Sequence, residues 1–287
     1  MNLELGMTFG LLTAAGFGTA DFFAKLSANR VGFLRTALFM QAIGTVLVLP
    51  FALTDTSRLF SHPWAALVGT LLGVVNAVAT LCLYKGFEVG RLAIVSPIAS
   101  TAPVVAILLA ITFLGETITM ERLFAISLVM LGIILVSIQR TEANALGQVA
   151  KGTAYAIGFM IMGGVLLFEL KPVSTDLGVF LPVLMIRWVG TLVLAVPFLS
   201  RRTRSLRLGM RAFRTIIVIA CLDTFANVTY NVGLIFGTVA IVSTLGGMFS
   251  AVTVLLAWVI LKERLTLHQS FGFAAIVLGV ATLSAFG

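Results

Sequence analysis

Polar side chains recur at helical spacing inside two strongly apolar stretches of this chain. Each set has members four positions apart: Asn76, Thr80 and Tyr84, and then Asp223, Asn227 and Asn231. Residues four apart share one face of a helix, so each set predicts a polar stripe. Such a stripe can bind a polar solute in a cavity, or it can hydrogen-bond a neighbouring helix. We expect a cavity wall, because the two stripes occupy equivalent places in a duplicated chain.

Two full charges, Arg187 and Asp223, lie near the middle of apolar stretches. A charge at that depth is costly and either finds a partner or serves a function. Arg187 could hold a carboxylate or phosphate, because a guanidinium suits planar anions. Asp223 could carry a proton or a substrate ammonium, or it could be the structural partner of Arg187. Together with Asp223 we assign Asp21 to ion coupling, although Asp21 could instead form an interfacial salt bridge with Lys25.

The remaining candidate substrate-binding residues are aromatic or lie near expected helix interruptions. Pro97 and Pro103 interrupt one apolar stretch, and Gly246-Gly247 loosen a second one close to the equivalent place. Such breaks free backbone polar groups, which is tolerated only beside protein or a cavity, so they indicate either a site or a packing kink. The candidates of this kind are Phe17, Pro97, Thr101, Tyr155, Phe159 and Thr244.

These residues belong to a chain that contains one stretch twice. Residues 93–116 read AIVSPIASTAPVVAILLAITFLGE and residues 240–263 read AIVSTLGGMFSAVTVLLAWVILKE, an offset of 147 positions. The same offset relates the two polar stripes. A period this long, used once, indicates a duplicated half rather than a solenoid. We predict a first repeat over residues 1–140, a linker over 141–150 and a second repeat over 151–287.

The composition excludes a soluble protein. Hydrophobic residues make up 60% of the 287 residues and charged residues 10%, with a mean hydropathy of +1.12. Apolar stretches of about 20 residues can cross ~30 Å of hydrocarbon as helices, and helices satisfy their own backbone groups in lipid. The predicted fold class is all-α integral membrane, with ten transmembrane helices. We expect them over residues 5–24, 33–53, 63–84, 92–114, 120–139, 149–170, 178–199, 212–234, 238–261 and 267–286.

Five helices in each half predict two inverted repeats, because an odd number makes the second half enter the membrane facing the other way. Both termini then lie on one side. Of the 19 Lys and Arg residues, Arg187 lies within a span, three (Arg58, Arg122 and Lys171) fall on the termini side and the other 15 on the opposite side. The positive-inside rule therefore predicts a multi-pass protein of the cytoplasmic membrane with extracytoplasmic termini. The net charge of +8 fits contact with anionic lipid, and we expect no nucleic acid.

Several motifs resemble the drug/metabolite transporter superfamily, specifically its ten-helix EamA branch. They are SPIASTAP at 96–103, LGE at 114–116 with Gly132 beyond it, their second-half counterparts, and GFGTADF at 16–22. The resemblance covers the whole chain and implies a carrier of amino acids, other metabolites, nucleotide sugars or drugs. The chain departs from relatives in two ways. Many members are described with cytoplasmic termini, and the coupling glutamate of the small four-helix relatives falls on Phe17 here.

We therefore predict a secondary active transporter that exports a small metabolite, such as an amino acid, by alternating access. A drug exporter or a metabolite importer is the nearest alternative, and a membrane-embedded enzyme acting on lipid is a more distant one. The sequence shows no ATP-binding loop, metal-ligand cluster or nucleophile–base set, so we expect no enzymatic activity, cofactor or metal. The expected partners are a small-molecule substrate, membrane lipids and protons, and the expected state is a monomer or weak dimer.

Overall fold

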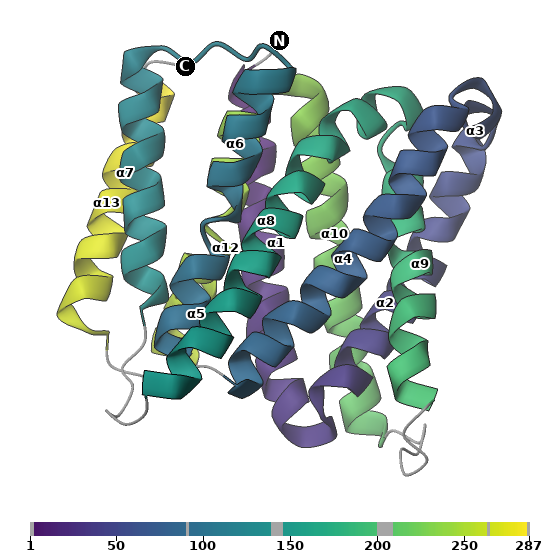
Figure 1. The fold of residues 1–287 in the computed structure, drawn as a ribbon, viewed down its shortest axis with the longest axis horizontal. Helices are drawn as coiled ribbons and strands as arrows, with labels where there is room; N and C mark the ends of the chain where they lie inside the picture. Colours follow the sequence, from purple (N-terminus) through teal and green to yellow (C-terminus); the bar gives the residue numbers. More distant parts are fainter. Residues whose placement is uncertain (1–2, 90–91, 139–145, 200–208, 263–264, 286–287) are drawn as a thin grey trace.

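The computed structural model describes residues 3–89, 92–138, 146–199, 209–262 and 265–285, and these form a helical bundle (Figure 1). Tyr84 lies in a described helix, but its side chain falls outside the described part. The helices are α1 (Leu3–Val31), α2 (Phe33–Ala52), α3 (Ser57–Ser61), α4 (Pro63–Val89), α5 (Leu92–Ala99), α6 (Ala102–Phe113), α7 (Met120–Ser137), α8 (Leu146–Leu177), α9 (Phe180–Leu199), α10 (Met210–Phe236), α11 (Val239–Gly246), α12 (Phe249–Leu261) and α13 (Leu267–Ala285), with a short 3-10 turn at Leu53–Asp55.

The described helices confirm the predicted all-α membrane fold. Within the described residues, nine segments are long and apolar enough to cross a membrane. Helix α1 supplies the tenth passage: it runs for 29 residues and packs along α10, α11 and α12. Two of the ten passages are built from pairs of shorter helices, α5 with α6 and α11 with α12. The short helix α3 lies in the connection between α2 and α4.

The helix contacts follow a two-fold relation between the halves. Exchanging the repeats maps the packing of α1 on α10 onto that of α8 on α4, and the packing of α1 on α12 onto that of α8 on α6. The contacts of α2 with α9 and of α7 with α13 map onto themselves. Both termini lie at one end of the bundle, called here the termini end (Figure 1). This is the arrangement of two inverted five-helix repeats.

Both predicted helix interruptions are present, and the two breaks meet. Helices α5 and α11 have eight residues each and begin 147 positions apart. The first break falls at Ser100 and Thr101, so Pro97 lies inside α5 and Pro103 lies in the first turn of α6, where a missing N–H costs nothing. The second break falls at Gly247, where an added Cβ would approach Cγ of Pro103 to 2.9 Å. Only a glycine lets the two breaks come this close.

The repeats differ in how tightly these short helices are packed. Helix α11 is buried along its whole length and packs against α6 and α7 near the termini end. Its counterpart α5 has no comparable packing against α12 and α13 among the described residues. The two ends of the bundle are therefore not equivalent, although the sequence is duplicated. The looser end is the one opposite the termini.

Candidate functional site

Two adjoining cavities lie in the interior between the repeats. The larger has a volume of about 290 Å³ and the smaller about 140 Å³. The larger cavity extends to Phe33, the first residue of α2, at the end of the bundle opposite the termini. The residues that line both cavities are Phe17, Asn76, Phe159, Leu166, Leu167, Tyr230 and Phe249. Helices of both repeats contribute to this shared wall.

The wall of the smaller cavity is mostly carbon, and its hydroxyl groups are already hydrogen-bonded to the protein. The Tyr230 hydroxyl donates to the Leu167 carbonyl oxygen at 3.0 Å and pairs with the Ser243 hydroxyl at 2.7 Å. The Thr13 hydroxyl pairs with that of Thr229 at 3.0 Å. The rest of the wall comes from the two helix breaks and from aromatic rings of α1, α8 and α12. A ligand group in this cavity would gain contact with carbon rather than with polar atoms.

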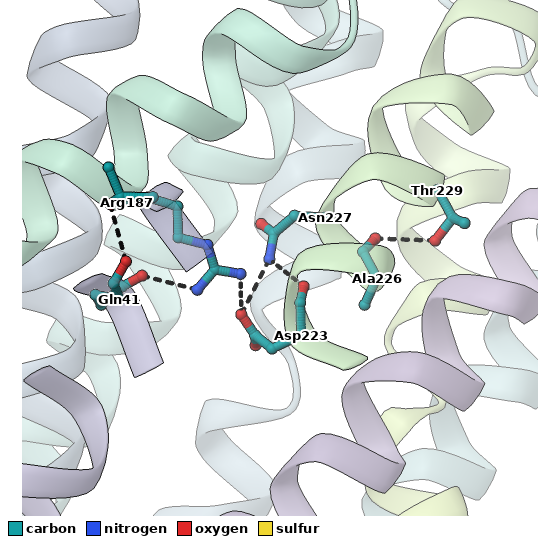
Figure 2. A network of polar contacts seen from close by, with 7 residues as sticks. Gln41, Arg187, Asp223, Ala226, Asn227 and Thr229 are labelled. Atoms are coloured by element: carbon teal, nitrogen blue, oxygen red, sulfur yellow. Dashed lines mark hydrogen bonds and ion pairs between the residues drawn. The ribbon is translucent and has the colours of Figure 1, made fainter. Parts of the chain in front are cut away.

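The larger cavity contains a polar network centred on Arg187 (Figure 2). Arg187 on α9 donates from Nη1 to Oε1 of Gln41 on α2 at 2.8 Å, and from Nη2 to the carboxylate of Asp223 on α10. One turn along α10, Asn227 donates from Nδ2 to the Asp223 carbonyl at 2.8 Å and to its carboxylate at 3.4 Å. Of the alternatives that the sequence left open for these two charges, the structure has Arg187 and Asp223 paired.

The ion pair is largely withdrawn from solvent. The Arg187 side chain is 3% exposed and that of Asp223 is 14% exposed. Space for the guanidinium comes from Gly44, where a Cβ would lie 3.0 Å from Arg187 Nε, and space for Gln41 comes from Gly190. Because two opposite charges share this site and bond Gln41 and Asn227 as well, the pair adds no net charge to the cavity.

Asp21 is the remaining carboxylate of the larger cavity. Its side chain is exposed to the cavity, and it makes no hydrogen bond or ion pair with any residue that the structure describes. Lys25, one turn further along α1, does not pair with it. A carboxylate without a described partner at a cavity wall within the membrane can bind a cation or a proton.

Eight predicted site residues line the cavities. Phe17, Asn76 and Phe159 line both of them, and Asp21, Thr80, Arg187, Asp223 and Asn227 line the larger one. The two polar stripes thus meet across the larger cavity, with the first two members of each stripe in its wall. They come from α4 of the first repeat and α10 of the second.

Five predicted residues lie outside both cavities. Asn231 lies on α10 two turns beyond Asp223, toward the termini end, where the helices pack closely. It is 1% exposed and donates to the Val179 carbonyl at 3.0 Å. Thr244 is fully buried and donates to its own helix at Ala240. Thr101 and Pro97 belong to the α5–α6 break, where the Thr101 hydroxyl bonds the Ile98 carbonyl. Tyr155 is 37% exposed on the outer surface of α8, beside Gly86.

Sequence reasoning missed several residues of the cavity walls, among them Gln41 and Phe249. Gln41, which fixes one side of the Arg187 guanidinium, is a single amide in an apolar span, and its position in the other repeat holds Trp188. Phe249 lines both cavities from the first turn of α12. An amide in the middle of an apolar span was the available signal for Gln41. Among 22 Phe residues, no sequence signal distinguishes Phe249.

A helical membrane bundle of two inverted repeats with a cavity between them defines a membrane transporter of small molecules. The sequence profile of the EamA-like transporter family matches this chain twice, over residues 4–138 and 150–285, and the chain belongs to that family.

The chain is also similar to an uncharacterized protein, MJ1333.1, of Methanocaldococcus jannaschii. The two are 28% identical over 136 residues, which cover 47% of this chain and 98% of that protein. That relative is therefore about as long as a single repeat. A solved structure, described only as a crystal structure of a protein, superposes with a TM-score of 0.81 at 16% identity, covering 99% of this chain and 98% of the other. It shares the fold.

Proposed function

We propose that this protein is a secondary active transporter that exports a small metabolite, such as an amino acid, across the cytoplasmic membrane by alternating access. One observation carries the proposal: a cavity between the repeats holds a carboxylate that has no partner among the described residues, and this cavity reaches the end of the bundle opposite the termini. Inverted repeats offer a second arrangement of similar energy, in which the opposite end opens. A carrier needs both arrangements.

The chemistry of the two cavities supports a solute with an ammonium group and an apolar body. Asp21 is the unpaired charge, whereas Arg187 already bonds Asp223 and Gln41. An ammonium near Asp21 would gain an ionic hydrogen bond, which is stronger than a neutral one. The smaller cavity, about 140 Å³ and apolar, would hold a side chain of the solute. A carboxylate of a zwitterion would face the side-chain amide of Asn76. The Thr80 hydroxyl is not available as a donor, because it donates to the Asn76 carbonyl at 2.8 Å.

We propose export as the direction of transport, and the charge bias is consistent with it. With the termini outside, as that bias predicts, the larger cavity faces the cytoplasm, from which an exporter loads its solute. For the coupling ion we propose protons, carried by Asp21. Of the two aspartates assigned to coupling, Asp21 has no partner and Asp223 is held by Arg187, so Asp21 exchanges a proton at a lower cost.

Counterflow in sealed proteoliposomes tests the proposal. Vesicles loaded with unlabelled amino acids should take up a labelled amino acid that also raises the melting temperature of the purified protein. Asp21→Asn should weaken the apparent affinity for that solute about tenfold or more, because an ionic hydrogen bond is lost. Asp176→Asn, on α8 outside both cavities, is the matched control and should leave the affinity unchanged.

Three outcomes would contradict parts of this proposal. If lipophilic cations exchange and amino acids do not, the protein is a drug exporter, an alternative that the apolar smaller cavity favours. If solute moves only inward under a proton gradient, it is an importer. If no solute exchanges and a lipid is turned over in detergent, the transporter proposal itself is wrong.

A further inference from the structure

The first turn of α11 depends on a carboxylate from the other repeat. Glu116, in the connection after α6, accepts hydrogen bonds from the backbone N–H groups of Val239 at 2.7 Å and Ala240 at 3.2 Å. The Thr238 hydroxyl accepts the next N–H, that of Ile241, at 3.3 Å. The first N–H groups of a helix have no partner within it. Because α11 is buried, Glu116 supplies the acceptors that water would otherwise provide.

The end of the preceding helix is capped by the opposite charge. Lys171 on α8 donates from Nζ to the Gly237 carbonyl at 2.7 Å and to the Leu234 carbonyl, both in the last turn of α10 or just after it. A cation at a helix C-terminus and an anion at a helix N-terminus both interact favourably with the helix dipole. Glu116 and Lys171 together satisfy the backbone on the two sides of the α10–α11 connection.

The backbone conformation after α6 orients the Glu116 side chain toward the α10–α11 connection. Gly115 has a φ of +65°, which reverses the chain at the helix end at no steric cost. The Glu116 N–H then bonds the Ala110 carbonyl at 3.2 Å, which fixes the backbone that carries the carboxylate. In the second repeat, Lys262 occupies the position of Gly115 and also has a positive φ, of 55°. The duplicated end of this stretch therefore has a duplicated backbone conformation.

These contacts lie at the closed end of the bundle. Gly237 packs against Gly6 of α1, near the N-terminus, so closely that a Cβ on Gly6 would lie 2.8 Å from the Gly237 Cα atom. The larger cavity, in contrast, extends to Phe33 at the far end. Lys171 and the α10–α11 connection belong to the second repeat, whereas Glu116 belongs to the first. If the repeats separate at the termini end, the contact of Glu116 with α11 must break.

We propose that Glu116 is a latch between the repeats, which holds the termini end closed while the cavity is open to the far end. Lys171 is the positioning residue that orders the backbone receiving it. This inference rests on the proposed alternating access. Without Glu116, two buried N–H groups lack acceptors in the closed state, and opening the termini end exposes them to water. Loss of the carboxylate should therefore favour the conformation open at the termini end.

Hydrogen exchange of the full-length protein in lipid nanodiscs, read by mass spectrometry, tests the latch. In Glu116→Ala, the amides of α11 should exchange about tenfold faster, because two buried donors lose their partner. The amides of the first turns of α2, at the far end, should exchange more slowly as that end closes. Glu116→Gln should show a smaller change of the same sign. Glu121→Gln, an exposed glutamate in the first turn of α7, is the matched control and should change neither region.

The slower exchange at the far end distinguishes a latch from an ordinary helix cap. Faster exchange in α11 with no change at α2 would overturn the proposal, because only local capping would then be lost. If Glu116→Ala does not fold, Lys171→Met should likewise speed amide exchange in α11 and slow it in the first turns of α2. Faster amide exchange in both regions would count against the latch. Counterflow measured on wild-type vesicles is a separate readout. Its absence would contradict transport, whereas the exchange pattern alone decides whether Glu116 couples the two ends.

Discussion

The buried pair of Arg187 and Asp223 gives the sharpest prediction. In Asp223→Asn, the Arg187 guanidinium keeps its bond to Gln41 but loses its counter-charge, on a side chain that is only 3% exposed in the wild type. Breaking a buried pair from one side costs about 3–5 kcal/mol, mostly because the surviving charge is left uncompensated. At about 2–4 °C for each kcal/mol in a chain of this size, the melting temperature should fall by roughly 6–20 °C.

A double-mutant cycle of Asp223→Asn and Arg187→Gln measures the interaction between the two charges apart from the effect of each substitution alone. Arg187→Gln should cost less than Asp223→Asn, because the remaining carboxylate is 14% exposed to the cavity and keeps Asn227. The double variant Asp223→Asn with Arg187→Gln removes both charges and should recover much of the loss. The coupling energy of the cycle should reach about 2–3 kcal/mol, the upper part of the range for contacting residues.

An exposed pair at the membrane surface provides the control. Arg58 and Asp55 lie 3.5 Å apart with side chains 46% and 29% exposed, so Asp55→Asn should cost at most about 1 kcal/mol. Melting temperature and proton-driven accumulation are measured on all variants. If Asp223→Asn melts like the wild type, and still exchanges solute but no longer accumulates it, the pair is not a structural element. Asp223 would then be a proton carrier, and the assignment of coupling to Asp21 alone would be wrong.

Two further predictions concern the cavity wall and the topology. Asn227→Ala removes a donor to Asp223 at the cavity, so we expect transport per folded molecule to fall about tenfold while the melting temperature changes by only a few degrees. A variant with a much lower melting temperature but normal transport per folded molecule would show that the amide only joins helices. A cysteine at residue 2 or 287, in a chain with Cys82 and Cys221 replaced, should react with an impermeant thiol reagent in intact cells; protection at both ends with labelling at residue 204 would reverse the predicted orientation.

Much of the fold could be predicted because duplication leaves the same signal twice. The 147-residue offset placed the two interruptions of the helices, and the structure has eight-residue helices α5 and α11 at matching positions. The stripe on α10 placed Asp223 and Asn227 in a cavity wall, as the period of the helix requires. Gln41 could not be predicted from the repeat, because the equivalent position of the second repeat holds Trp188 rather than another amide or charged residue.

The sequence could not predict which end of the bundle is open. A duplicated chain is equally consistent with a cavity that extends to either end, because exchanging the two repeats would give equivalent contacts at the other end. The structure has α11 packed on α6 and α7, with α5 lacking comparable packing in the described part. This choice explains why Asn231 lies outside the cavity although Asp223, two turns along the same stripe, lines it. The stripe extends beyond the open part of the bundle into the closed part.

The charged residues of the larger cavity do not follow the two-fold relation of the helices that carry them. Met40 and Asn76 occupy the first-repeat positions of Arg187 and Asp223, so both members of the ion pair belong to the second repeat. The bond from Arg187 to Gln41, in contrast, joins the two repeats through α9 and α2. A rotation of one repeat against the other can break that bond and leave the ion pair intact. Arg187 Nη1 would then lose its acceptor in one conformation, in addition to Nε, which has no hydrogen-bond partner in this structure. A carboxylate of the solute would therefore bind differently at the two ends of the cycle.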